Sequence, residues 1–219
     1  MSVLKAKGIV LKEFDAGESG KTLIILAEGL GKIMVSARGA KKVTGKIFSA
    51  SEIFTCSEFC FYEGKGFLTL TQAEVIEKFY NIRNDIERLS YAYYFSDLIN
   101  SSLFEGMEAD DVLRLLLRSL TVLSKTEASP KLAARVFELR LLKALGFSSD
   151  APEDSFPLSP GAYNAISYIM KSDEKRAFSF KASEEVLSEI AAYTRGRIAF
   201  YMGKNFKSLD FAEKFGIDY

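Results

Sequence analysis

The chain contains no histidine among its 219 residues. Histidine is the commonest general base near neutral pH and the commonest metal ligand, so its absence excludes histidine-based catalytic triads and metal centres. Carboxylates and lysines, including Ser–Lys variants of the nucleophile–base pair, stay open as catalytic groups. Because the carboxylates are scattered without any repeated pairing, we expect no enzyme and no cofactor.

Cysteine is scarce as well, since the chain contains only Cys56 and Cys60. If the segment TCSEFC is a strand, the four residue steps from Cys56 to Cys60 span about 13 Å. A disulfide requires Cα atoms within about 7 Å of each other. Two thiolates also fall short of the four ligands of a structural zinc site. We therefore expect both cysteines to be small residues of the core or of a sheet face.

Long hydrophobic runs are missing, although 48% of the residues are hydrophobic. No apolar run reaches the roughly 18 residues that a transmembrane helix needs. The first ten residues, MSVLKAKGIV, are too mixed in polarity for a signal peptide. The composition therefore predicts a cytoplasmic protein with a buried core and no membrane partner.

Net charge is also absent, because 29 basic residues balance 29 acidic ones, but the charges are unevenly placed. The first fifty residues carry nine basic groups against four acidic ones. Residues 38–46, which we call the basic loop, contain Arg38, Lys41, Lys42 and Lys46 and no acidic residue. A second basic zone near the C-terminus contains Arg195, Arg197, Lys204 and Lys207. Such asymmetry indicates binding to a polyanion.

The segment GESGKT, residues 17–22, ends like the P-loop of a nucleotide-binding protein. The P-loop motif requires glycine at position 15, which is Asp15 here, and a helix after the lysine, where this sequence predicts a strand. An ATPase is therefore not expected.

The first eighty residues predict β-structure and the rest predict helices. Alternating or β-branched segments indicate five strands, at residues 3–12, 22–27, 32–37, 51–62 and 67–73. Five strands in about seventy residues suit a small closed barrel such as the OB-fold. Helical spacing and capping residues indicate five helices, at residues 85–100, 110–123, 130–145, 160–170 and 183–201. The predicted fold class is α+β, with an N-terminal OB-fold β-barrel at residues 1–80 followed by an all-α helical bundle at residues 81–219.

Small barrels bind single-stranded nucleic acid with a basic groove and with aromatic side chains that stack on bases. The basic residues of the barrel are accompanied in sequence by Phe48, Phe54, Tyr62 and Phe67. These aromatic residues fit two interpretations, as core residues or as an exposed stacking platform.

A set of short segments in a fixed order carries a family resemblance. The barrel contributes KGIVL (residues 7–11), Gly17-Glu18-Ser19, Gly31-Lys32 and ARGA (residues 37–40). The helical part contributes RVFELRLLKALGF, LSPGAYNAI and GKNFKSL. With these segments the chain resembles the RecO family of bacterial DNA repair and recombination mediators. One feature departs from it, because many members carry a four-cysteine zinc module where this chain has no cysteine, near residues 147–157. The zinc module is expected to be deleted, and no metal is implied.

The resemblance implies a protein that binds single- and double-stranded DNA, anneals complementary strands and helps to load recombinase on DNA coated with single-strand-binding protein (SSB). It implies RecR and the acidic C-terminal tail of SSB as partners, and a place at the nucleoid when active. The expected DNA-binding residues are Lys32, Arg38, Lys41, Lys42, Lys46, Arg195, Arg197, Lys204 and Lys207. Arg135 is a candidate for the SSB tail, and its alternative is an ion pair with Glu138 at i+3. A second hypothesis is a protein-binding adaptor that has lost its own DNA binding.

Overall fold

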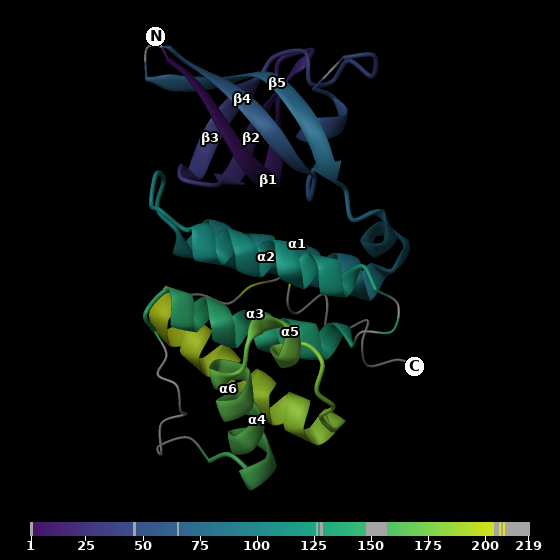
Figure 1. The fold of residues 1–219 in the computed structure, drawn as a ribbon, viewed down its shortest axis with the longest axis vertical. Coiled ribbons are helices and arrows are strands. Elements are labelled where there is room, and N and C mark those ends of the chain that lie inside the picture. The colour runs from purple at the N-terminus through teal and green to yellow at the C-terminus, as the bar shows by residue number, and fades with distance from the viewer. Residues whose placement is uncertain are drawn as a thin grey trace. The chain divides into compact units, whose positions relative to one another are not determined.

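A β-barrel is followed along the chain by helices (Figure 1), in a computed structural model that describes residues 2–45, 47–64, 66–125, 127, 129–147, 157–203, 206 and 208. The predicted fold class is confirmed. The chain forms two compact units. The first contains the described residues of Met1–Tyr80 and Ile99–Arg114, and the second contains those of Asn81–Leu98 and Leu115–Tyr219.

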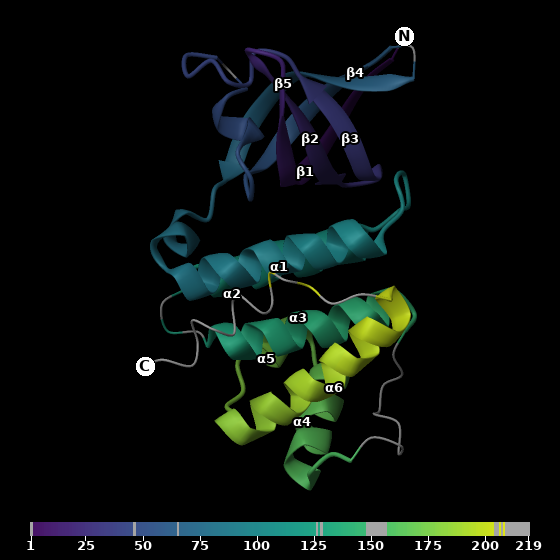
Figure 2. The ribbon, with the colours of Figure 1, turned by 180° about the vertical axis from the view of Figure 1, so that it is seen from behind.

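Five strands close the barrel in the order β1–β2–β3–β5–β4 (Figures 1 and 2). In chain order, β1 to β5 comprise Ser2–Ala16, Gly20–Ala27, Gly31–Ala37, Cys56–Gly64 and Phe67–Glu77. One half of β1 pairs with β4 and the other half with β2, in both cases antiparallel. The register of β1 against β2 shifts between Val10 and Lys12. Such a β-bulge bends the strand. The ring closes through a short parallel pairing of β3 with β5.

The barrel interior is filled by alternate residues of all five strands. Phe59 and Phe61 of β4 are fully buried, and their rings stack with centroids 5.8 Å apart. They pack in one cluster with aliphatic residues that include Val10, Leu23 and Ile25. The alternation of apolar residues in the sequence therefore corresponds to the inner face of the barrel.

The connection between α1 (Ile86–Ser102) and α2 (Asp110–Leu123) packs on the β2–β3 turn, within the first unit. Gly31 has φ of +68°, and a Cβ placed on it would lie 1.9 Å from the carbonyl oxygen of Met107. The Gly29 N–H donates to Asp110 Oδ1 at 2.9 Å, and the Gly106 N–H donates to the Lys32 carbonyl at 2.9 Å. Residues 99–114 are therefore part of the barrel's unit, although they follow it in sequence.

The helices α1 to α4 comprise Ile86–Ser102, Asp110–Leu123, Pro130–Ala144 and Pro160–Lys171, and α5 and α6 comprise Glu174–Ala177 and Glu184–Met202. Helices α3, α4 and α6 begin with serine caps, at Ser129, Ser159 and Ser183. Gly146, with φ of +76°, follows the end of α3. Helices α3, α4 and α6 pack around one apolar core. No helix of the described chain has the length and apolar content to span a bilayer.

The structure corrects the predicted start of the fourth strand. Residues 49–51 form a 3-10 turn, η1 (Ser49–Ser51), and β4 begins at Cys56 instead of residue 51. Phe54 has φ of +62°, a conformation that a strand does not accommodate. A second 3-10 turn, η2 (Tyr80–Asn84), and the short α5 were not predicted. Cys56 is buried and Cys60 half-buried, both as free thiols, so their prediction as core and sheet-face residues is confirmed.

Candidate nucleic-acid interface

The basic loop follows β3 and is shaped by successive tight turns. The Lys42 N–H donates to the Gly39 carbonyl at 3.0 Å, and the Gly45 N–H donates to the Lys42 carbonyl at 2.7 Å. Gly39 has φ of +73°, which glycine adopts without the strain of a side chain. The glycines of this loop therefore allow it to turn sharply while it presents its cations.

Lys41 anchors the basic loop to the β1–β2 turn. Its ammonium donates to the Gly17 carbonyl at 3.1 Å and lies 3.1 Å from Asp15 Oδ1. Its backbone N–H also donates to the Ser19 carbonyl at 3.0 Å. Part of the Lys41 charge is consequently balanced within the protein.

Arg38 and Lys42 are the exposed cations of the basic loop. Neither side chain forms an ion pair or a hydrogen bond with another residue that the structure describes. Their charges therefore face solvent on either side of the anchored Lys41. Lys46 lies outside the described residues.

Lys32 is at the opposite end of β3 from the basic loop. Its ammonium donates at 2.7 Å to the carbonyl of Asn100, in the last turn of α1. A cation at that position compensates the partial negative charge of the helix C-terminus. The contact gives Lys32 a role inside the first unit, and its contact with DNA stays a prediction.

The second basic zone belongs to the helical unit. Arg197 donates to the Phe147 carbonyl at 2.9 Å and to the Tyr201 hydroxyl at 3.0 Å, and its guanidinium lies 5.1 Å from the Tyr201 ring centroid. Arg195, two residues earlier in α6, is exposed. Lys204 and Lys207 lie outside the described residues.

The four aromatic residues singled out from the sequence have different environments. Phe54 is buried, as the core interpretation expects, whereas 75% of Phe67 is exposed. Phe48 and Tyr62 are half-buried. Of the four, only Phe67 has the exposure that a stacking platform requires.

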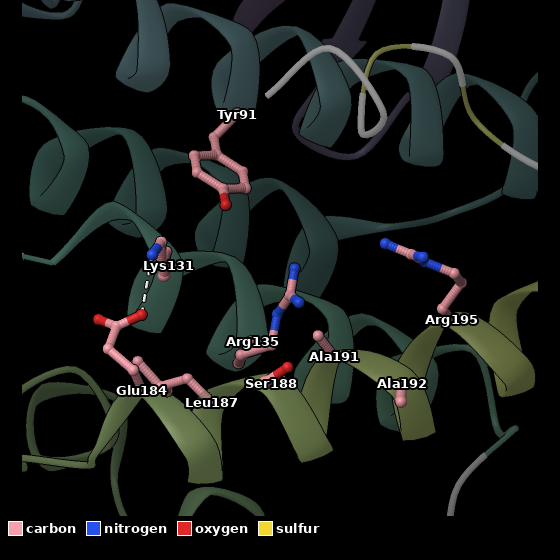
Figure 3. Close-up of a pocket in the computed structure, with 9 residues that line it drawn as sticks. All are labelled: Tyr91, Lys131, Arg135, Glu184, Leu187, Ser188, Ala191, Ala192 and Arg195. Atoms are coloured by element: carbon pink, nitrogen blue, oxygen red, sulfur yellow. Dashed lines mark hydrogen bonds and ion pairs between the residues drawn. The ribbon is translucent and has the colours of Figure 1, made fainter. Parts of the chain in front are cut away.

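A pocket of about 350 Å³ lies between α1, α3 and α6 in the helical unit (Figure 3). Its charged lining consists of Lys131, Arg135, Arg195 and Glu184, and the Lys131 ammonium lies 2.8 Å from Glu184 Oε2. The remainder of the lining is Tyr91, Leu187, Ser188, Ala191 and Ala192. Three cations against one carboxylate, beside an apolar wall, suit a ligand that is both anionic and apolar.

Arg135 is held in this pocket by a buried carboxylate. Its Nη2 donates to Glu138 Oε1 at 2.9 Å, so the i+3 ion pair considered from the sequence is confirmed. Glu138 also accepts from the Tyr94 hydroxyl at 2.9 Å and from Thr194 Oγ1 at 2.6 Å. All four residues are buried, so Glu138 links α1, α3 and α6 through hydrogen bonds.

Of the other charged residues of the pocket, Arg195 was predicted only as a DNA contact, and Lys131 and Glu184 were not predicted. Lys131 and Arg135 are four residues apart, a spacing that places two side chains on one face of a helix. Glu184, Ser188 and Arg195 follow a similar helical spacing in α6. These spacings were visible in the sequence, but nothing in it indicated that the two faces lie together.

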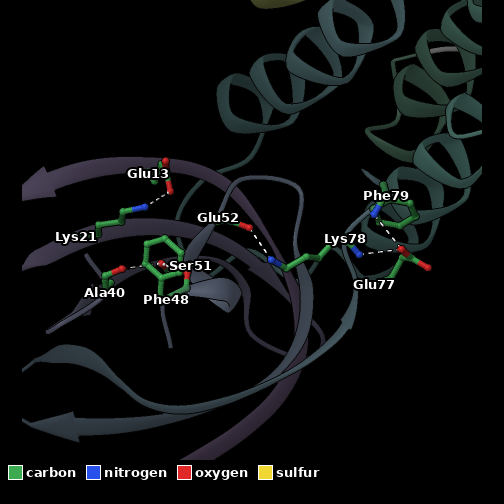
Figure 4. Close-up of polar contacts among 9 residues, drawn as sticks. All are labelled: Glu13, Lys21, Ala40, Phe48, Ser51, Glu52, Glu77, Lys78 and Phe79. Carbon is green, nitrogen blue, oxygen red and sulfur yellow. Dashed lines mark hydrogen bonds and ion pairs between the residues drawn. The ribbon is translucent and has the colours of Figure 1, made fainter. Parts of the chain in front are cut away.

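Two ionisable residues outside these sites have shifted pKa values with clear causes. Burial raises the pKa of Glu87, and the nearby Asp85 adds to the effect, while Lys131 and Arg88 oppose it. Burial lowers the pKa of Lys78, but hydrogen bonds to Glu52 and Tyr80 outweigh it, so the net shift is upward. The Lys78 ammonium lies 2.7 Å from Glu52 Oε2 (Figure 4). Burial and neighbouring side chains therefore account for both pKa shifts.

Metal ligands do not gather in the part of the chain that the structure describes. No group of three Asp, Glu or Cys side chains there is arranged to hold a metal ion. The predicted loss of the zinc module concerns residues 147–157, of which residues 148–156 lie outside the described chain.

The similarity of this chain to known proteins extends over both units. The family described as "Recombination protein O N terminal" matches residues 1–79, and "Recombination protein O C terminal" matches residues 83–151 and 148–210. The DNA repair protein RecO of Acetivibrio thermocellus is 33% identical over 242 aligned positions, which cover 96% of each chain. The protein of the same name from Clostridium acetobutylicum is 26% identical, over 96% of this chain and 97% of its own. On these matches the chain belongs to the RecO family.

Proposed function

We propose that this chain acts in DNA repair as a DNA-binding recombination mediator. The name that its relatives carry, DNA repair protein, supports the role in repair. The observation that carries DNA binding is the pair of exposed cations, Arg38 and Lys42, on a loop of a closed five-stranded barrel. We assign DNA binding to the barrel domain, residues 1–80, and partner binding to the helical domain, residues 81–219.

Binding to the phosphate backbone follows from the charge of the basic loop. Each phosphate that a lysine or arginine neutralises releases condensed counterions, so affinity falls as salt rises. Arg38, Lys41 and Lys42 are the described residues that we assign to this contact. Lys32, Lys46, Arg195, Arg197, Lys204 and Lys207 stay predicted contacts with single- or double-stranded DNA.

The pocket of the helical unit suits the acidic, apolar C-terminal tail of SSB. Lys131, Arg135 and Arg195 would attract its carboxylates, while Leu187 and its alanine neighbours would cover an apolar side chain. Together with RecR, a protein that holds both DNA and this tail brings recombinase to SSB-coated DNA and anneals complementary strands. These steps proceed by binding and need no catalytic residue. The proposed site of action is the cytoplasm, at the nucleoid.

The adaptor hypothesis also has an observation in its favour. The side chains of three predicted DNA contacts bind groups within the chain instead. These are Lys32, Lys41 and Arg197. If the remaining cations are too few to hold DNA, the pocket would be the functional site and DNA binding would require a partner.

Fluorescence anisotropy of a labelled single-stranded oligonucleotide at two salt concentrations separates the two functions. The test variant carries Arg38→Glu, Lys41→Glu and Lys42→Glu. The control carries Lys171→Glu, Lys175→Glu and Lys181→Glu, three exposed lysines of the helical unit with the same change of net charge. A mediator binds in a salt-sensitive way, and only the first variant loses binding. Absence of binding by the folded wild type would favour the adaptor.

A further inference from the structure

The connection between α1 and α2, residues 103–109, is held at its ends and at its middle. Leu103 and Ala109, its first and last residues, are buried. At the middle, Glu105 forms a parallel β-bridge with Lys32. Hydrogen bonds to the β2–β3 turn add to this bridge. A segment that is already ordered loses little further conformational entropy when a partner binds it.

Two apolar side chains of this ordered segment are nevertheless open to solvent. Phe104 is 82% exposed and Met107 44% exposed. Gly106, between them, has φ of +73°, and a Cβ placed on it would meet no atom within 4 Å. Phenylalanine and methionine are enriched at the centres of protein–protein contacts. The connection therefore presents an aromatic ring that a pocket of a partner can enclose.

The charges beside these two side chains are acidic. Residues 101–113 contain four carboxylate side chains and no lysine or arginine. Asp111 forms an ion pair with Arg114. Glu105 and Glu108 are exposed, and neither forms an ion pair with another residue that the structure describes. The exposed surface of the connection is therefore both apolar and anionic.

The pocket between α1, α3 and α6 has the opposite charge and a similar apolar character. Its lining carries three cations against one carboxylate, next to Leu187 and its alanine neighbours (Figure 3). Its volume of about 350 Å³ exceeds the roughly 150 Å³ of a cavity that accepts a benzene ring. A phenyl ring with carboxylates beside it therefore matches this pocket in size, polarity and charge.

We propose that the connection of one copy of this chain docks in the pocket of a second copy. Phe104 lies against the apolar wall of the pocket, and the flanking Glu105 and Glu108 face its cations. The contact consists of one inserted ring and partly exposed charges, so the association is weak and reversible. The inference rests on the proposed function of the pocket as a site for acidic, apolar ligands, and it adds a regulation of that site. A pocket filled by a second copy cannot take up an acidic tail, so self-association and tail binding compete.

Sedimentation velocity of the full chain, over a wide range of protein concentrations, measures this association. The test variant is Phe104→Ala, and the matched control is Phe200→Ala, which removes a phenylalanine of α6 that is 81% exposed. We expect Phe104→Ala to weaken self-association at least about tenfold, as for an aromatic residue at the centre of a contact. The control should associate as the wild type does. Added salt should weaken the association of the wild type, because exposed charges are screened.

A mixing experiment tests whether the connection meets the pocket. Lys131→Glu reverses one cation of the pocket and should weaken self-association as Phe104→Ala does. The Phe104→Ala chain keeps an intact pocket, and the Lys131→Glu chain keeps an intact connection. An equimolar mixture of the two variants should therefore associate more strongly than either variant alone. Restoration in the mixture also shows that both variants are folded.

Competition with a ligand links the contact to the proposed function. The probe is an acidic peptide with an apolar last residue and a free carboxylate. We expect it to dissociate the associated wild type, and to bind Phe104→Ala with the affinity that it has for the wild-type monomer. A peptide that binds the pocket without dissociating the copies would show that they meet elsewhere and overturn the inference.

The remaining outcomes distinguish the inference from the function beneath it. If the wild type stays monomeric at every concentration while the peptide binds, the function of the pocket stands and the inference is wrong. If Phe104→Ala and Phe200→Ala weaken association equally, or the mixture gains nothing, the connection does not meet the pocket and the inference is overturned. If the mixture restores association but the peptide does not bind, self-association through the pocket is supported and the proposed tail binding fails.

Discussion

Lys41 Nζ lies 3.1 Å from Asp15 Oδ1, so the basic loop carries its own acidic counterpart on the β1–β2 turn. Asp15 is 80% exposed at its side chain, whereas that of Lys41 is 27% exposed. The pair is therefore accessible to a ligand, and an approaching phosphate competes with the carboxylate for the same ammonium.

Replacing Asp15 with asparagine should strengthen DNA binding. The change removes a negative charge beside Lys41 and leaves the side-chain shape nearly unchanged. We expect affinity for a single strand at low salt to rise about two- to fivefold, the range of an exposed ion pair. Anisotropy measures the effect, with Glu74→Gln in β5 as a control of equal charge change. Equal gains in both variants would indicate a general effect of net charge and contradict a local role of Asp15.

The substitutions Gly31→Ala and Gly29→Ala should reduce the free energy of unfolding by different amounts. Both have φ near +67°, but only Gly31 would place a Cβ against Met107, whereas Gly29 has no atom within 4 Å. Gly29→Ala should reduce the free energy of unfolding by about 1 kcal/mol, for backbone strain alone. Gly31→Ala should reduce it by roughly 2–4 kcal/mol, because the connection between α1 and α2 must shift as well. Urea denaturation compares the two, and equal losses would show that this connection does not pack on the turn.

The contact between Gly31 and Met107 could not be predicted from the sequence, unlike the strands and helices. The strands and the serine-capped helices were predictable, because alternation and caps depend on residues close in sequence. The packing of residues 99–114 on the barrel depends on the Gly29–Asp110 hydrogen bond across 81 positions, which no local pattern encodes. For the same reason Lys32 was predicted only as a DNA contact, since its partner Asn100 is 68 positions away. Arg135 was different, because Glu138 is within one helical turn.

Glu138 predicts a large loss of stability when its carboxylate is removed. Glu138→Ala would leave the buried Arg135 without its counter-charge and the Tyr94 hydroxyl without its acceptor. Removing one partner of a buried ion pair typically costs about 3–5 kcal/mol. The control is Glu184→Gln, which breaks the exposed pair with Lys131 and should cost less than about 1 kcal/mol. A loss for Glu138→Ala as small as that of the control, measured by urea denaturation, would contradict the buried network.

The Glu87→Gln variant and the wild type should differ in thermal stability by an amount that depends on pH. Burial, together with Asp85, raises the pKa of Glu87 above its usual 4.5, so the folded state holds this proton more tightly than the unfolded state. Its contribution to stability is therefore complete below about pH 4.5 and is lost as pH rises through the raised pKa. Glu87→Gln should raise Tm relative to the wild type at pH 7, and the difference should shrink at pH 4. A Tm at pH 7 that is unchanged or lower in the variant would show that Lys131 and Arg88 outweigh burial.

The pocket between α1, α3 and α6 predicts opposite effects of its two kinds of charge on an acidic partner. The probe is a labelled acidic peptide with an apolar last residue and a free carboxylate, and its control is the same peptide amidated at the C-terminus. Lys131→Met should weaken binding of the free peptide, because one of the three cations of the pocket is lost. Glu184→Gln should strengthen binding, because it removes the only carboxylate among the described lining residues and releases Lys131 from its ion pair. Each change should be about two- to fivefold, because the Lys131–Glu184 pair is partly exposed. Strengthening by both variants would mean that the peptide binds elsewhere, whereas weakening by both would point to the ion pair as a support of the fold.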